Sequence, residues 1–125
     1  MKILVDSSVW IDFFRGGKNS KILETYIDDN LICTNDLILA ELIPHLKLQK
    51  QKKVIELLNI IENIPLIINW NKIIDYQTLC LKHGVNKVGI PDLLIVQNTF
   101  DNNLNLFTLD EHFILISKFI KLKLI

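Results

Sequence analysis

The chain has 125 residues, half of them hydrophobic, and its 14 basic and 14 acidic side chains give a formal net charge of zero. That length suits one domain, residues 1–125, and a balanced charge neither favours nor excludes a nucleic-acid partner. No apolar run approaches the roughly 20 residues that span a bilayer, and the first one is too short for a signal peptide, so we expect a cytoplasmic protein with no membrane partner. Cys33 and Cys80 match no zinc spacing, and we expect both as reduced core residues.

The first stretch, residues 1–17, predicts a buried strand, a tight corner and an amphipathic helix. The apolar run over residues 3–5 ends at Asp6, which therefore stands at the carboxyl end of a strand that we expect to be central in a parallel sheet. Ser7 or Ser8 is the expected N-cap of the helix, and the glycines at 16–17 end it. A carboxylate in this place is either a partner for the start of the helix or a ligand for a cation.

The rest of the chain alternates helices with short strands. Its hydrophobic periodicity predicts helices over residues 19–29, 37–48, 54–62, 69–83, 89–101 and 110–116, and strands over residues 31–33, 64–68, 104–108 and 121–125. We expect Pro44 to kink or break its helix, whereas Pro65 is tolerable at the start of a strand or on an edge. The alternation predicts an α/β fold, a three-layer α/β/α sandwich with a mostly parallel central sheet.

Four carboxylates stand at equivalent points of this pattern, where they can converge at the carboxyl edge of the sheet: Asp6, Glu41, Asp92 and Asp110. Taken alone, Asp92 fits a helix-dipole partner and Asp110 an N-cap. Glu41 on a largely apolar helix and Asp6 behind a buried strand are harder to explain, because a half-buried carboxylate is costly unless it is paired or metal-bound. Crowded acids without matching arginines predict a divalent cation, and oxygen ligands favour Mg²⁺ or Mn²⁺.

Such a site suits hydrolysis of phosphodiesters by a metal-activated water. Ser7, Ser8 and Thr108 sit beside the acids, where each is either a helix or turn cap or a group that orients water or a carboxylate. Two other carboxylate-dependent classes fit less well. A haloacid-dehalogenase-like phosphatase needs a second Asp where Ser8 stands, and a response-regulator receiver needs an acidic pair at the first strand.

Four segments carry a family resemblance: ILVDSSVWIDFFRG at 3–16, NDLILAELI at 35–43, IPDLLIVQNT at 90–99 and LFTLDEHF at 106–113. With them the chain resembles the PIN-domain nucleases, and most closely the VapC-type toxins of toxin–antitoxin pairs. It departs from the family at Val96, where Ala is common, and at Pro44-His45, where a glycine is often found.

The resemblance implies a PIN-like fold and an endoribonuclease that depends on Mg²⁺ or Mn²⁺, with RNA as substrate and a cognate antitoxin as partner. It places the catalytic and metal-binding acids at Asp6, Glu41, Asp92 and Asp110. Two alternatives stay open. One is a PIN nuclease that processes RNA without an antitoxin, and the other is a catalytically idle PIN domain that serves as a binding module.

The remaining features have two interpretations each. The one basic cluster consists of Lys47, Lys50, Lys52 and Lys53, and it is either a solvated helix end or a contact for the RNA backbone. Arg15 either contacts phosphate or a partner's carboxylate, or serves as the cation at a helix C-terminus. We expect Trp10 and Phe14 in the core, and His112 packing against or capping its short helix. Apolar helical faces in excess of what a small sheet covers predict a homodimer.

Overall fold

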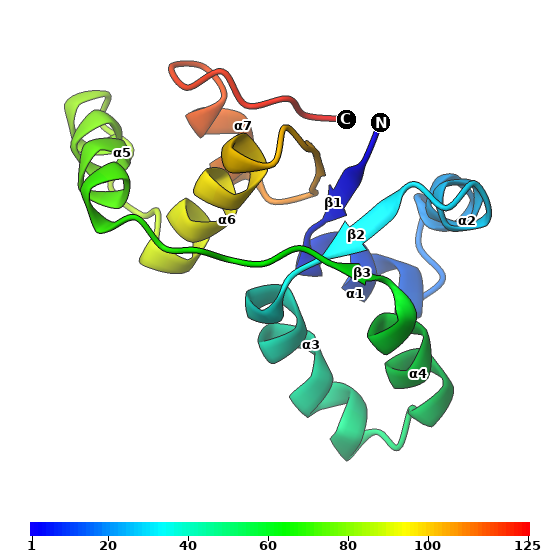
Figure 1. Cartoon of the computed structure of the whole chain (residues 1–125). Helices are drawn as coiled ribbons and strands as arrows, with labels where there is room; N and C mark the ends of the chain where they lie inside the picture. The colour runs from blue at the N-terminus through cyan, green and yellow to red at the C-terminus, as the bar shows by residue number, and fades with distance from the viewer.

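The computed structural model describes residues 1–125 (Figure 1). In chain order its elements are β1 (Ile3–Val5), α1 (Ser7–Phe14), α2 (Ser20–Asp28), β2 (Ile32–Thr34), α3 (Asp36–Leu48), α4 (Lys52–Ile60), β3 (Glu62–Asn63), α5 (Trp70–Lys82), α6 (Ile90–Asp101), β4 (Asn105–Phe107) and α7 (Glu111–Ile116). The predicted alternation of strands and helices is confirmed.

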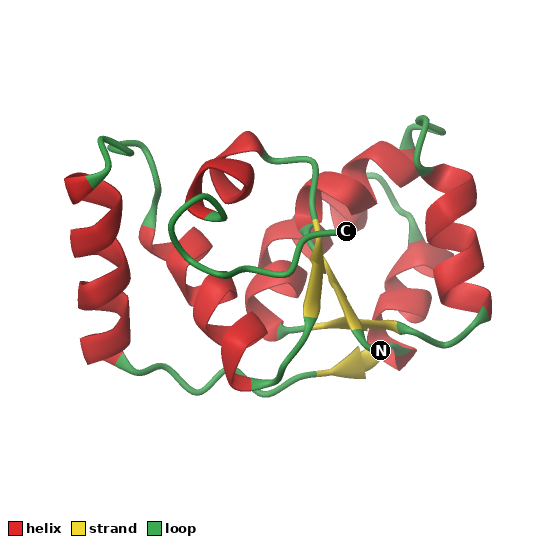
Figure 2. Cartoon of the chain, turned by 90° about the horizontal axis from the view of Figure 1, so that it is seen from above, coloured by secondary structure: helices red, strands yellow, loops and turns green.

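All four strands pair in parallel, in the order β3-β2-β1-β4. Strand β1 is central and completely buried, with Ile3 in register with Ile32 on one side and with Asn105 on the other. Helices lie on both sides of the strands, with α5, α6 and α7 on one side and α2, α3 and α4 on the other (Figures 1 and 2). This confirms the predicted α/β sandwich with a parallel central sheet.

The hydrophobic core is one cluster of 27 buried residues that includes all of β1. Trp10 is completely buried, as expected, and Phe14 is partly buried with its ring stacked on that of Trp10. Both cysteines are free and buried, and burial raises the pKa of the Cys33 thiol to about 12, which keeps it protonated and unreactive. No helix combines the length and the apolar character needed to cross a bilayer.

The predicted strand over residues 64–68 is wrong. Strand β3 ends at Asn63, and the chain then crosses without regular structure to α5 (Figure 1). Its neighbour β2 ends at Thr34, so after the bond from the Ile64 N–H to the Thr34 carbonyl no strand is left to pair with. The backbone of the crossing segment is hydrogen-bonded instead by amide side chains of α6.

Two buried amides of α6 hold this crossing segment. The Asn98 amide nitrogen donates to the Pro65 carbonyl at 3.0 Å, and the Asn98 oxygen accepts from Asn35 at 2.9 Å. The Gln97 amide donates to the Ile67 carbonyl, and its oxygen accepts from the backbone N–H of Asn69. Side chains thus satisfy backbone groups that the predicted strand would have paired within a sheet.

Three further expectations are corrected. The predicted strand over residues 121–125 is reduced to one isolated bridge between Leu124 and Leu106. The N-cap of α1 is Asp6, because the helix already begins at Ser7. Of the kink or break expected at Pro44, the break does not occur, since α3 is continuous, and because Pro44 is exposed, water can bond the carbonyl that its missing N–H leaves free.

Replacing Asn98 by alanine removes both amide bonds from the interior and leaves the Pro65 carbonyl and the Asn35 amide unpaired. We expect Asn98→Ala to lower the free energy of unfolding by about 2 kcal/mol, measured by urea denaturation. The matched control is Asn59→Ala on the exposed surface of α4, which should change it by less than about 0.5 kcal/mol. Equal effects of the two variants would contradict this role for Asn98.

Candidate active site

The strand order places the candidate site. From β1 the chain proceeds outward to β2 and β3, whereas β4 pairs on the opposite side of β1. Parallel sheets form a crevice at the carboxyl edge of the strands at such a reversal of strand order. Asp6 follows β1 directly, and Thr108 and Asp110 follow β4. A backbone bond of 3.0 Å from the Asp6 N–H to the Phe107 carbonyl joins the two strand ends.

Asp6 is held by two hydroxyl groups. Its side chain is buried and does not cap α1, although Asp6 occupies the N-cap position. Instead its Oδ2 atom accepts hydrogen bonds from Ser8 Oγ at 2.8 Å and from Thr108 Oγ1 at 2.9 Å. The same hydroxyls accept the backbone N–H groups of Leu109 and Asp110. They therefore fix the orientation of the Asp6 carboxylate and tie together the segments that follow β1 and β4.

Of the two roles considered for these hydroxyls, Ser8 and Thr108 have the one that orients a carboxylate, because both donate to Asp6. Ser7 does not: its side chain is half-buried and makes no hydrogen bond. Asp6 Oδ1 has no hydrogen-bond partner within the protein, so one oxygen of this buried carboxylate is left for another ligand.

Four acids act on one another at this edge. The pKa of Glu41 is raised, first by partial burial and then by the charges of Asp6, Asp92 and Asp110. Burial also raises the pKa of Asp92, as do the charges of Asp110 and Asp6, while a backbone hydrogen bond from Gly89 and the neighbouring His112 partly offset this. The charges of Asp6 and Asp110 therefore act on both Glu41 and Asp92, and one oxygen each of Asp92 and Asp110 lie within 4.8 Å of each other.

Glu41 differs from its expected environment. It lies on α3 at the rim, where the residue is exposed, so the cost of burying this side chain is smaller than its apolar helix suggested. Asp92 is half-buried in the first turn of α6, where it also has the favourable helix-dipole position that the sequence indicated.

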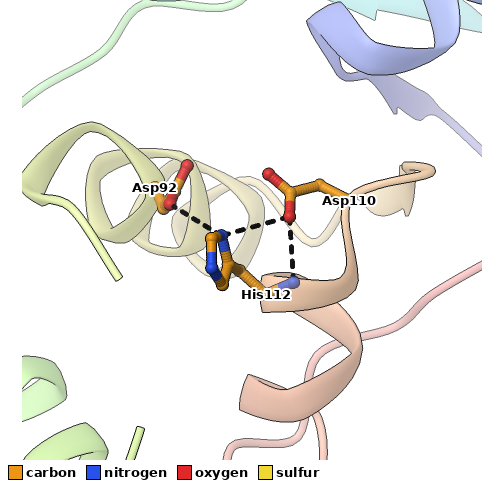
Figure 3. A group of neighbouring side chains, drawn as sticks. All are labelled: Asp92, Asp110 and His112. Atoms are coloured by element: carbon orange, nitrogen blue, oxygen red, sulfur yellow. Dashed lines mark hydrogen bonds and ion pairs between the residues drawn. The ribbon is translucent and has the colours of Figure 1, made fainter. Parts of the chain in front are cut away.

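Asp110 caps α7, as one of its two interpretations predicted, through a bond of 2.9 Å from the His112 backbone N–H to Asp110 Oδ1. The position of the His112 ring was not anticipated. Its Nδ1 atom lies 3.2 Å from Asp110 Oδ1 and 4.0 Å from Asp92 Oδ2 (Figure 3). The sequence carried no signal for this contact, because side chains two residues apart do not share a helix face, and the reach to Asp92 depends on the packing of α7 and α6.

The donor set fits a divalent cation. One ligand atom from each of Asp92, Asp110 and His112 lies within 4.8 Å of the others, and Asp6 and Glu41 are electrostatically coupled to the same group. Carboxylate oxygens are the ligands of Mg²⁺ and Mn²⁺, and imidazole is compatible with Mn²⁺ and other transition metals. A cation would also remove the mutual repulsion that raises the pKa of Glu41 and Asp92.

The basic residues lie apart from the acids. Lys47, Lys50, Lys52 and Lys53 are exposed around the turn between α3 and α4. Lys47 is six residues beyond Glu41, roughly 9 Å along the helix axis at 1.5 Å per residue. Figure 1 shows this turn at the far end of the α3–α4 hairpin from the start of α3.

Arg15 shares a cavity with one of the acids, Glu41. It ends α1 and lines a cavity of about 320 Å³ between α1 and α3, together with Glu41, His45 and Gln49 and the apolar side chains of Ile11, Phe14, Leu42 and Leu46. The cavity therefore combines four apolar side chains with one of the four acids, Glu41, and the cation of Arg15.

The model of the family described as "PIN domain" matches residues 3–118. The chain belongs to the PIN domain family. This confirms the resemblance drawn from the four sequence segments, all of which fall within the matched residues. No curated protein matches the chain.

Solved structures share the fold of this PIN domain. It is similar to VapBC2 from Rickettsia felis bound to a DNA fragment from their promoter, with a TM-score of 0.78, 21% identity and coverage of 100% of this chain and 98% of that chain. It is also similar to VapBC-1 from nontypeable Haemophilus influenzae, with a TM-score of 0.74, 19% identity and coverage of 100% and 97%. A third similar structure is DNA-bound VapBC from Salmonella typhimurium, with a TM-score of 0.70, 16% identity and coverage of 100% of this chain and 97% of that chain.

Replacing Glu41 by glutamine removes one of the mutually repelling carboxylates. In EDTA at neutral pH we expect Glu41→Gln to raise the free energy of unfolding, by less than about 1 kcal/mol because solvent screens charges at the exposed rim. Because folding raises the pKa of Glu41, the folded protein binds this proton more readily than the unfolded chain. The loss of stability that the Glu41 charge causes in the wild type should therefore disappear as pH falls to the ordinary range of glutamate pKa values. The difference in the free energy of unfolding between the wild type and the variant should disappear with it.

Urea denaturation over roughly pH 4 to 7 measures this difference. Glu56→Gln, which removes a carboxylate from the exposed surface of α4, is the control and should show no such trend. In saturating Mg²⁺ the wild type should instead have the higher free energy of unfolding, because it binds the ion more tightly than Glu41→Gln does. Identical behaviour of the two variants in EDTA would rule out repulsion at Glu41.

Proposed function

We propose that this PIN domain is a metal-dependent endoribonuclease and the toxin of a toxin–antitoxin pair. The observation that carries the proposal is the convergence of Asp6, Glu41, Asp92 and Asp110 at the reversal of strand order in a PIN fold. No lysine or arginine forms an ion pair with any of these four acids, and the only basic side chain paired with them is the imidazole of His112. Such crowding is costly in a metal-free protein and useful in one that binds a divalent cation.

The residues have distinct roles in this proposal. Asp6, Asp92, Asp110 and Glu41 hold Mg²⁺ or Mn²⁺, whose chemistry when bound is to activate water and to neutralise the charge that develops on phosphate. Ser8 and Thr108 are positioning residues, because they fix Asp6 Oδ2 by hydrogen bonds and leave Oδ1 free. Asp110 is fixed in the same way by the backbone N–H of His112. These bonds hold the carboxylates in place before the cation and the RNA arrive, which limits the reorganisation needed for catalysis.

An antitoxin is the proposed protein partner. The similar solved structures are VapBC complexes. In this chain, the cavity between α1 and α3 is the surface that we assign to an antitoxin peptide. Its apolar side chains suit a peptide with apolar side chains, and the charges of Glu41 and Arg15 suit a basic and an acidic side chain beside them. A peptide bound there would cover the rim of the acidic site and would exclude RNA.

A second copy of the chain is the other proposed partner. Helix α5 packs on α6, and its free surface carries three apolar side chains, with Trp70 59%, Ile74 61% and Leu81 56% exposed. Their spacing of four and seven residues places them on one side of α5. A contiguous apolar stripe of this kind marks a protein interface, and we assign it to the homodimer.

The decisive experiment is cleavage of total RNA by the purified, antitoxin-free protein with Mg²⁺ or Mn²⁺. We expect discrete fragments that disappear in EDTA, and a rate that falls at least about a hundredfold in Asp6→Asn, because the substitution removes a charged ligand while keeping the shape of the side chain. Asp29→Asn, at the exposed end of α2, is the matched control and should cleave like the wild type. A folded protein that cleaves nothing would favour the idle binding module, and cleavage that persists in EDTA would refute the metal chemistry.

The two interfaces are tested with a reciprocal pair of variants. Ile11→Glu places a charge in the α1–α3 cavity at a residue that is 41% exposed, and should abolish relief of growth arrest by the product of a neighbouring antitoxin-like reading frame. Ile74→Glu should leave that relief intact and convert the dimer to a monomer in light scattering. Each variant is the control for the other, and a monomeric wild-type protein would contradict the α5 interface.

A further inference from the structure

His112 is the histidine whose ring faces acidic side chains. The other two have different surroundings: the His83 ring stacks on Phe119 with 4.3 Å between centroids, and His45 lines the α1–α3 cavity. The His112 ring instead points between two carboxylates that come from different elements, Asp92 on α6 and Asp110 before α7 (Figure 3).

Capping does not account for this ring position. The backbone N–H of His112 already makes the capping bond to Asp110 Oδ1. The ring is an additional contact to the same oxygen, and its side chain is 38% exposed, so it is not confined there by tight packing. Its reach to Asp92 Oδ2 links α7 to α6, which the capping bond cannot do.

The spacing of the three atoms suits shared coordination. Two atoms that each bind one cation at about 2.1 Å lie no more than about 4.2 Å from each other. The distance from His112 Nδ1 to Asp110 Oδ1 is 3.2 Å, and that from Nδ1 to Asp92 Oδ2 is 4.0 Å. Both distances fall within that limit, so His112 Nδ1 would be able to share a cation with either carboxylate oxygen.

We propose that His112 supplies a nitrogen ligand, through Nδ1, to the divalent cation of this site, and that this ligand makes the site favour Mn²⁺ over Mg²⁺. The proposal rests on the proposed function, since it concerns the same metal site. Mg²⁺ prefers oxygen ligands and dehydrates reluctantly, whereas imidazole nitrogen is a good ligand for transition metals. Exchanging one oxygen ligand for nitrogen therefore shifts affinity toward Mn²⁺.

Electron spin-echo spectroscopy of bound Mn²⁺ tests the ligand directly and without reference to RNA cleavage. We expect the wild-type protein to show a nitrogen coupling to Mn²⁺ that changes when its histidines carry ¹⁵N. The coupling should be absent in His112→Phe, which keeps an aromatic ring but removes the nitrogen, and should persist in His83→Phe. A bound Mn²⁺ without histidine coupling in the wild type would overturn the proposal and leave the proposed nuclease function standing.

Metal affinity tests the selectivity. Replacement of His112 by phenylalanine should raise the Kd for Mn²⁺ at least about tenfold and change the Kd for Mg²⁺ by less than about threefold. Asp92→Asn should raise the Kd for both metals, and His83→Phe should change neither Kd. If His112→Phe raised the Kd for Mn²⁺ and for Mg²⁺ by the same factor, the proposal that His112 makes the site favour Mn²⁺ would be overturned. A wild-type protein that binds neither metal would refute this proposal and the proposed function together.

Discussion

Parallel pairing of β1 with both β2 and β4 is the constraint on which the site depends. Strand β1 is buried between these two partners, and the strand order reverses beside it. A crevice forms at the carboxyl end of the strands at such a reversal. The residue that leaves β1 there is Asp6, and the residues that leave β4 include Thr108 and Asp110. Residues about a hundred positions apart in sequence thereby share one hydrogen-bonded cluster, through Ser8 and Thr108 on a single carboxylate oxygen.

The electrostatics of that edge follow from its construction. Helices α3 and α6 both begin at the carboxyl side of the sheet, so Glu41 and Asp92 are brought to the same edge as Asp6 and Asp110. The fold supplies hydroxyl and backbone donors for individual oxygens, but no arginine or lysine forms an ion pair with any of the four acids. Partial burial and repulsion together raise the pKa of Glu41 and of Asp92, which is the electrostatic signature expected of a site for a cation.

Sequence periodicity predicted the helices well and the strand ends poorly. Strand β1 and helices such as α5 and α6 were evident because burial imposes a pattern on consecutive residues. Residues 64–68 have the composition of a strand, but β2 ends at Thr34, and the amides of Gln97 and Asn98 take the place of a neighbouring strand. Pairing depends on a partner that lies elsewhere in the chain, so composition alone could not decide it.

The sequence by itself determined the fold class and the PIN family and predicted the four acids of the proposed site, because strand–helix alternation and the four family-like segments are local patterns. Tertiary structure alone decided three other features: Ser8 and Thr108 fix Asp6, Ser7 makes no such bond, and the basic cluster lies at the far hairpin turn. It also decided that the ring of His112 reaches Asp92 on another helix. Local patterns show which residues follow which element, whereas contacts between side chains distant in sequence depend on how those elements pack.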